Sequence, residues 1–162
     1  MKQEDVTMFA RCLIPLLLFM LISSPGLHAA AKPNDRAALA GLKTAKVIFD
    51  MRVTDSDKLV FNLTLFGETL DSLIAQRIKP EMVVAFRGPG IGLLSTTELD
   101  EEALDLIRSL KKKGVRFEAC ALAMRTFKVD PKGLVREIRL VANIFNSLIG
   151  YQHKGYALIV IS

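Results

Sequence analysis

The feature that most constrains the fold of this chain is a regular alternation of short apolar segments with longer amphipathic ones. Short runs rich in β-branched and aromatic residues fit strands, whereas apolar residues spaced three and four apart fit helices with one buried face. Strands that alternate with helices imply a parallel sheet with helices on both faces. We therefore predict a single-domain α/β fold with three layers and about five mostly parallel strands. The expected strands are 43–53, 82–88, 115–120, 135–142 and 156–162, and the expected helices are 57–77, 95–114, 121–127 and 143–155.

Two further expectations follow from these segments. The run ALIVI at 157–161 is uniformly apolar, so we expect a strand that is buried on both faces. In the helix at 95–114, acidic residues fill the first turn and lysines fill the last, as the helix dipole favours, and we expect Thr97 and Gly114 to cap its ends. The lysine run is then a solvated helix end. Since the net charge is only +5, we expect no nucleic-acid partner.

The first 31 residues have the organisation of a secretory signal peptide. Residues 12–22 are apolar and uncharged, and this run is shorter than the roughly 20 residues of a membrane span. A proline-glycine pair and three alanines that end at Ala31 follow, and these suit a signal peptidase. We expect cleavage there, a periplasmic protein with no membrane segment, a linker at 32–43 and one domain at 44–162. An uncleaved anchor is the alternative, because acidic residues cancel the positive charge at the N-terminus.

The sequence RGPGIG at 87–92 lies between an expected strand and an expected helix. A dinucleotide-binding fingerprint would require a further glycine at the position of Leu93, and a phosphate-binding loop would require Gly-Lys-Ser/Thr. The chain has neither, so we expect no nucleotide cofactor here. We interpret the segment as a tight turn that lets another part of the backbone approach closely.

The sequence lacks the residues that a metal site or a catalytic histidine would require. Without the leader, the chain would keep one cysteine and one histidine, which are too few for a zinc site. A Ser-His-Asp triad would require His153, but no nucleophile-elbow sequence accompanies it. His153 precedes the last strand and Cys120 ends the third, so a Cys-His pair would have to join distant edges of the sheet. We predict no metal and no cofactor, and we expect His153 on the surface.

Cys120 is the residue that best fits a chemical role. Sites in open parallel sheets form beyond the carboxyl ends of the strands, where Cys120 is expected. At the start of a following helix, its thiolate would be stabilised by backbone N–H groups and by the positive end of the helix dipole. Arg87 and Arg125 would add to this if they fold nearby. The competing interpretation is a small core residue, since alanines and a leucine surround Cys120.

Several segments of the chain occur in a characteristic order. The most specific is Gly-Val-x-Phe-x-x-Cys at 114–120, with Met124 and Arg125 after it. The others are KVIFDM, FNLTLFGETLD, EMVVAFRGPGIGLL and GYALIVI. Together they resemble the DsrE/DsrF-like family of small α/β proteins with a YchN-like fold, and the resemblance covers roughly residues 44–161.

The resemblance implies a sulfur-relay protein. Cys120 matches the cysteine that accepts sulfane sulfur as a persulfide and passes it on, which would be a sulfurtransferase-like activity. Members usually form trimers or hexamers, so the implied partners are further copies of the chain and a protein that donates or accepts sulfur. The residues expected to form the substrate pocket are Asp50, Arg87, Gly88, Pro89, Gly90 and Arg125.

This chain departs from the family pattern at two places. Leu122 and Ala123 follow the cysteine where relatives often have polar residues, and Asp50 stands where many relatives have histidine. A carboxylate close to Cys120 would disfavour the thiolate. Two alternatives to sulfur transfer therefore stay open. One is a non-catalytic oligomeric binding module that keeps the fold, and the other is a disulfide between subunits through Cys120.

Overall fold

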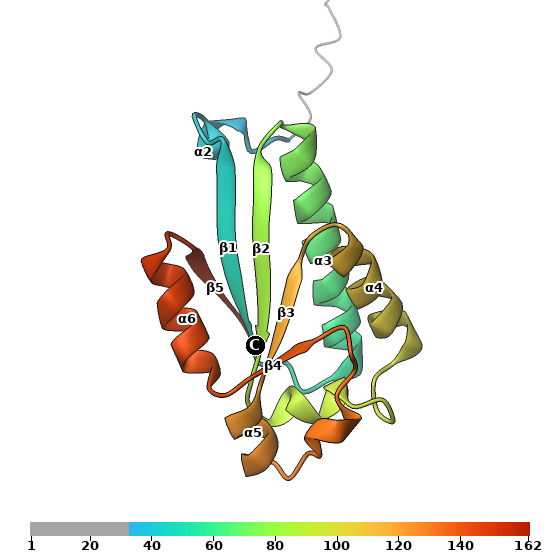
Figure 1. Cartoon of the computed structure of the whole chain (residues 1–162). Helices are drawn as coiled ribbons and strands as arrows, with labels where there is room; N and C mark the ends of the chain where they lie inside the picture. The colour runs from blue at the N-terminus through green and yellow to red at the C-terminus, as the bar shows by residue number, and fades with distance from the viewer. Residues whose placement is uncertain (1–32) are drawn as a thin grey trace, which may run out of the picture. The chain divides into compact units, whose positions relative to one another are not determined.

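Five parallel strands form one sheet, in the order β4-β3-β2-β1-β5 (Figure 1). The computed structural model describes residues 33–162, so the predicted signal peptide and Cys12 lie outside the described residues. The α/β class, the strand number and the parallel pairing are as predicted. The strands are β1 (Thr44–Met51), β2 (Lys79–Phe86), β3 (Arg116–Cys120), β4 (Arg139–Val141) and β5 (Ala157–Ile161).

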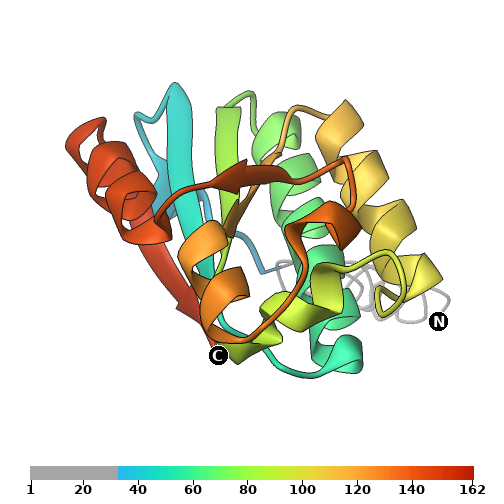
Figure 2. The ribbon, with the colours of Figure 1, turned by 60° about the horizontal axis from the view of Figure 1, so that its bottom comes forward.

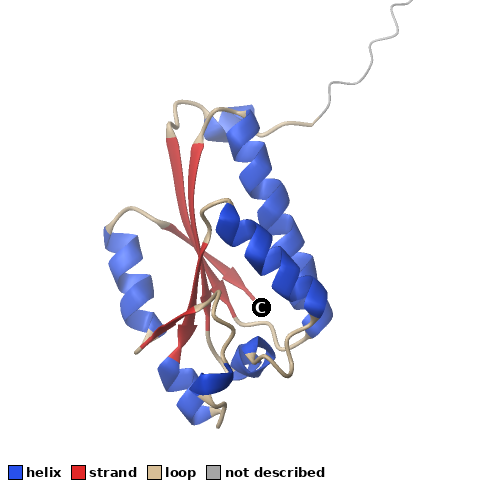
Figure 3. Cartoon of the chain, turned by 45° about the vertical axis from the view of Figure 1, so that its right-hand side comes forward, coloured by secondary structure: helices blue, strands red, loops and turns tan. Residues whose placement is uncertain are grey.

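Helices cover both faces of the sheet and give three layers, with α3 and α4 on one face and α6 on the other (Figure 3). The chain adds β2 and β3 in one direction from β1 but adds β5 on the other side of β1. Because parallel crossovers are right-handed, the reversal of direction places α6 on the opposite face. The helices are α2 (Arg36–Leu39), α3 (Ser56–Ala75), α4 (Glu101–Lys112), α5 (Ala121–Thr126) and α6 (Ile144–His153), and the 3-10 helices are η1 (Pro89–Leu94) and η2 (Pro131–Gly133).

The core lies on both faces of the sheet, within the compact unit Leu39–Ser162, and includes buried residues of α3, α4 and α6. Asp55 caps α3 by accepting a hydrogen bond from the backbone N–H of Lys58, and the apolar stripe of α3 then faces the sheet. Phe49 of β1 stacks on Phe66 of α3, with ring centroids 4.1 Å apart. The helical spacing of apolar residues thus predicted most of the buried face correctly, but Ile74, expected on the same face, is 53% exposed.

Most element boundaries differ from the predicted ones by a few residues, and the largest differences are at the start of α4 and in β4. Asp100 caps α4 by accepting hydrogen bonds from the N–H groups of Glu102 and Ala103, so the expected cap at Thr97 is wrong. The strand predicted at 135–142 shrinks to β4, because the N–H of Val135 instead donates to the carbonyl oxygen of Leu94 at the end of η1, at 3.3 Å. There Leu134 forms an antiparallel bridge with Ser95.

The expectation that the last strand is buried on both faces is also wrong. β5 is an edge strand that pairs only with β1 among the described residues. Its side chains are largely exposed, with 45% of Ile159 and 47% of Val160 accessible. Uniform apolarity therefore marks here an apolar sheet edge rather than a central strand.

The carboxyl ends of the strands gather α5, η1 and the start of α6, and Figure 2 turns this end of the sheet toward the viewer. Gly90 in η1 lies against the backbone that follows β1, and a Cβ on Gly90 would come within 1.8 Å of the Val53 carbonyl oxygen. The predicted close approach of another backbone is thus confirmed. It ties η1 to the segment after β1.

Candidate functional site

Cys120 is the last residue of β3 and the N-cap of α5. Its Sγ accepts a hydrogen bond from the backbone N–H of Ala123, at 3.4 Å, and a second from the backbone N–H of Ile144, at 3.5 Å. These donors come from the first turns of α5 and α6, so two helix N-termini converge on one sulfur. Partial positive charge at helix N-termini favours a thiolate or another sulfur anion. The residue itself is only 3% exposed.

Local sequence explains why α6 begins beside the sulfur. The side chain of Asn143 caps α6 by accepting a hydrogen bond from the N–H of Phe145, at 3.0 Å. The N–H of Leu122 donates to the Ala142 carbonyl oxygen at 3.3 Å, which ties the first turn of α5 to the approach to α6. Together these bonds hold the N–H of Ile144 against Sγ.

Asp50 lies on the same face of the sheet as Cys120 and binds two arginines. In register, Asp50 pairs with Ala85 and Ala85 pairs with Glu118, which shares a face with Cys120 because side chains alternate along a strand. Arg87 Nε lies 2.7 Å from Asp50 Oδ1, and Arg52 Nη2 lies 2.7 Å from Asp50 Oδ2. Each arginine adds a second hydrogen bond to this carboxylate, at 2.9 Å.

The arginines determine the charge of Asp50. Burial alone would raise the pKa of this carboxyl, but the hydrogen bonds and charges of Arg87 and Arg52 outweigh burial and hold the pKa below its ordinary value of 3.8. Asp50 is therefore ionised at neutral pH. One carboxylate and two guanidinium groups leave a net formal charge of +1. The cluster of Asp50 with its two arginines thus carries no net negative charge.

Arg87 connects this cluster to α6. Its guanidinium carbon lies 5.0 Å from the centroid of the Phe145 ring, a cation–π contact. Phe145 follows Ile144, whose N–H donates to Cys120. The cluster of Asp50, Arg52 and Arg87 therefore packs against the helical turn that binds the sulfur.

The other predicted pocket residues fall into two groups. Gly88 has a φ of 75°, which favours glycine, and Pro89 and Gly90 begin η1, so this loop lies at the carboxyl end of β2 beside Arg87. Arg125 is different: it lies in the last turn of α5 with an exposed side chain. Within residues 33–162 its side chain forms no ion pair with Asp50.

Three residues of this site were missed from the sequence. Arg52 could have been found, because positions two apart on a strand share a face and Arg52 would then meet Asp50. Ile144 and Phe145 could not, since only the tertiary path of the chain brings the start of α6 to β3. His153, by contrast, is exposed at the end of α6, as expected for a surface residue.

The described part of the chain has neither a metal-ligand cluster nor a helix suited to cross a membrane. From residue 33 onward, no group of three or more His, Cys, Asp and Glu side chains is arranged to hold a metal ion. None of the helices between residues 33 and 162 has the length and apolar character that a bilayer crossing requires.

Fold and site together define a class: a small all-parallel α/β protein with a cysteine at the N-termini of two helices. The sequence places the chain within that class, because the model of the DsrE/DsrF-like family matches residues 18–161. The chain therefore belongs to the DsrE/DsrF-like family. No curated protein matches the chain.

Solved structures support the fold assignment. A protein of unknown function from Methanobacterium thermoautotrophicum, MTH1491, is similar over 72% of this chain and 99% of its own, with 21% identity and a TM-score of 0.60. A conserved protein of unknown function from Bacteroides thetaiotaomicron, BT1422, is similar over 70% of this chain and 94% of its own, with 18% identity and a TM-score of 0.52. At these identities the likeness extends to the fold alone.

Proposed function

We propose that this protein carries sulfane sulfur as a persulfide on Cys120. Membership of the DsrE/DsrF-like family suggests a sulfur-relay role, and Cys120 is the only cysteine in residues 33–162. The observation that carries the proposal is the pair of backbone N–H groups, from Ala123 and Ile144, that donate to Sγ. Such donors stabilise negative charge on sulfur when it attacks and when it leaves.

The transfer requires no external oxidant or reductant. The Cys120 thiolate attacks the outer sulfur of a donor persulfide R–S–SH, an S–S bond forms to Cys120, and the donor leaves as R–S⁻. An acceptor thiolate then attacks the outer sulfur of the Cys120 persulfide, and Cys120 leaves as a thiolate held by the same two N–H groups. The atoms and electrons balance across both steps.

Sulfur must reach a thiol that is almost fully buried. The turn that begins α6 contacts Sγ through Ile144, and the neighbouring Phe145 side chain is half exposed. A displacement of this turn would open a path to Cys120 between α6 and α5. Arg87, which lies against Phe145, borders that path and provides positive charge for an anionic donor or acceptor.

The partners and the compartment belong to the same proposal. We infer a homo-oligomer, a trimer or hexamer as the family resemblance implies, and the exposed apolar edge strand β5 supports it because single copies rarely leave such an edge unprotected. We also infer export to the periplasm, on the basis of the signal-like sequence at residues 1–31. A protein that donates or accepts sulfur would complete the relay.

One observation favours a second candidate function. Cys120 is 3% exposed, and buried alanines at 119 and 123 lie beside it. A non-catalytic oligomeric binding module that keeps the fold would bury its cysteine in the same way. In that case Cys120 would contribute packing and no sulfur chemistry.

Mass spectrometry of the native chain separates the two functions. After treatment with inorganic polysulfide, we expect Cys120 to gain one sulfur atom and the Cys120→Ser variant to gain none at that peptide. In the full chain, which keeps residues 1–31, the matched control is Cys12→Ser, which removes the other cysteine and should leave the gain on Cys120 unchanged. If Cys120 gains sulfur only after denaturation, the sulfur-carrier proposal is wrong and the binding module is favoured.

A further inference from the structure

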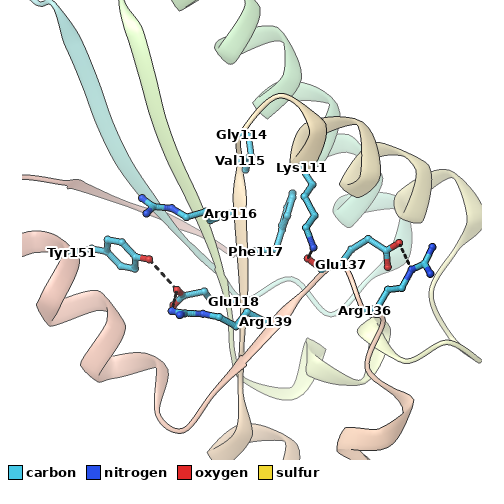
Figure 4. Close-up of a pocket in the computed structure, with 10 residues that line it drawn as sticks. All are labelled: Lys111, Gly114, Val115, Arg116, Phe117, Glu118, Arg136, Glu137, Arg139 and Tyr151. Carbon is cyan, nitrogen blue, oxygen red and sulfur yellow. Dashed lines mark hydrogen bonds and ion pairs between the residues drawn. The ribbon is translucent and has the colours of Figure 1, made fainter.

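A cavity of about 620 Å³ lies beside the edge of β3, and Cys120 is not among its lining residues (Figure 4). Its volume is in the range of small-molecule sites. β4 pairs only with Glu118, Ala119 and Cys120, so within residues 33–162 the first part of β3 has no strand neighbour on this side. The shortness of β4 therefore creates the cavity.

Glu118 on the cavity wall has one carboxylate oxygen without a partner. The residue is 1% exposed, and its Oε1 accepts hydrogen bonds from Arg139 Nη2 at 2.6 Å and from the Tyr151 hydroxyl at 3.0 Å (Figure 4). Its Oε2 is buried and accepts no hydrogen bond from any described residue. An unsatisfied buried carboxylate oxygen is costly, so this atom is suited to accept from a donor on a bound molecule.

Arg116, on the same wall, is a cation held by neutral groups. Its guanidinium lies over the rings of Tyr151 and Tyr156, at 5.2 and 5.7 Å, and donates to the Tyr156 hydroxyl. Within the described part of the chain it forms no ion pair with a carboxylate. Burial, reinforced by Glu118, raises the pKa of Tyr151, which therefore stays a neutral donor at physiological pH.

The charges on this wall select the chemistry of a ligand. Among the residues that line the cavity, Glu118 pairs with Arg139 and Glu137 pairs with Arg136, which leaves the positive charges of Arg116 and Lys111 without a carboxylate partner. A ligand that matches both features needs an anionic group for Arg116 and a hydrogen-bond donor for Glu118 Oε2. Glu118 and Arg116 lie two residues apart on one strand, so both face the same side of the sheet, about 7 Å apart along the backbone.

We propose that this cavity binds a small carboxylate with a hydrogen-bond donor on the neighbouring carbon, the chemistry shared by α-hydroxy and α-amino acids. The carboxylate binds Arg116, and the donor group binds Glu118 Oε2, which is buried in the unliganded chain and meets the ligand after a rotation of the Glu118 carboxylate. The binding is independent of sulfur chemistry at Cys120, because the two sites share no lining residue. Failure of one proposal therefore leaves the other unaffected.

Calorimetric titration of the full chain tests this site with three probes. L-lactate provides a hydroxyl on the neighbouring carbon, L-serine provides an ammonium there and a hydroxyl one carbon further on, and propionate has the carboxylate but no donor. We expect lactate or serine to bind about tenfold or more tightly than propionate, the size of effect that one hydrogen bond to a charged group produces.

Variants assign the binding to the two residues. Glu118→Gln and Arg116→Gln should each weaken binding of the better probe by about tenfold or more. The matched controls, Glu68→Gln and Arg77→Gln, remove the same charges from exposed sites elsewhere and should leave binding unchanged. If Glu118→Gln does not fold, the comparison of lactate and serine with propionate on the unaltered chain still tests whether the cavity requires a hydrogen-bond donor on the ligand.

Three results would overturn the proposal. The first is no binding of either lactate or serine, and the second is equal binding of propionate. The third is a crystal structure, grown with the better probe, that shows only an ordered water on Glu118 Oε2. In each case the cavity would be a solvated gap in the sheet edge rather than a ligand site.

Discussion

Replacement of Asp50 by asparagine should destabilise the fold and release the arginine that borders the path to Cys120. The Asp50 side chain is 2% exposed and accepts hydrogen bonds from Arg87 and Arg52 on both of its oxygens. An asparagine at this position would keep the shape of the side chain but lose the negative charge. Two guanidinium groups would then lie side by side without a carboxylate between them.

The expected loss of stability follows from the burial of the three partners. Removing one member of a buried ion pair costs about 3–5 kcal/mol, because the other charge stays buried and unpaired. Here the Arg87 and Arg52 side chains keep 20% and 40% of their surface exposed, so water can hydrate both after the change. We therefore expect the free energy of unfolding to fall by about 2–3 kcal/mol for Asp50→Asn.

Urea denaturation of both chains measures this difference, with Asp71→Asn as the matched control. Asp71 pairs with Lys113 at 2.8 Å, but both side chains are about half exposed, so its loss should cost no more than about 1 kcal/mol. Similar losses for the two variants would refute the conclusion that burial makes the Asp50 cluster important for stability.

The pH dependence gives the same prediction an independent check. Since the pKa of Asp50 is lower in the folded chain than its ordinary value of 3.8, its ionisation stabilises the fold above that value. The contribution is lost as the pH falls through the folded-state pKa. The difference between wild type and Asp50→Asn should therefore be constant near neutral pH and shrink in acid. If the stability difference between the two chains grows in acid, the conclusion that the fold lowers the pKa of Asp50 is wrong.

Further predictions concern the backbone and the sheet edge. Gly90→Ala should cost about 2–3 kcal/mol in urea denaturation, because its Cβ would meet the Val53 carbonyl oxygen, whereas Gly150→Ala in open space within α6 should stabilise by about 0.5–1 kcal/mol. Equal changes in the free energy of unfolding for the two variants would contradict the close approach of Gly90 to the Val53 backbone. Val160→Lys on β5 should reduce the oligomer size in gel filtration, whereas Ile74→Lys on α3, similarly exposed, should not. An oligomer unchanged by Val160→Lys would exclude β5 as the interface.

Local patterns predicted much of this fold. Apolar spacing identified α3 and its buried face, and the capping residue Asp55 fits the start of that helix. Composition failed to predict the exposure of β5, because an apolar run does not indicate whether other strands and helices cover it. That depends on strand order, and the position of β5 beside β1 at the edge leaves Val160 exposed.

The candidate site was only partly predictable for the same reason. The position of Cys120 at the end of a strand and the start of a helix follows from neighbouring residues. The second N–H donor, from Ile144, depends on a helix 24 residues further along the chain that crosses to the other face. From its neighbours in the sequence, Glu118 is one charged residue in a strand, and its burial could not be predicted. Only the folded chain brings Tyr151 and Arg139 to one of its oxygens and leaves the other without a partner.

The central claim is that Cys120 takes up sulfane sulfur and passes it on while the protein stays folded. Time-resolved intact mass spectrometry tests it most directly: polysulfide loads the native chain, a thiol acceptor is added, and near-UV circular dichroism is recorded alongside. We predict that Cys120 gains one sulfur atom and then returns to the original thiol, with the dichroism unchanged throughout. Loading that occurs only when the dichroism shows unfolding, or a loaded sulfur that no thiol removes, would contradict the account.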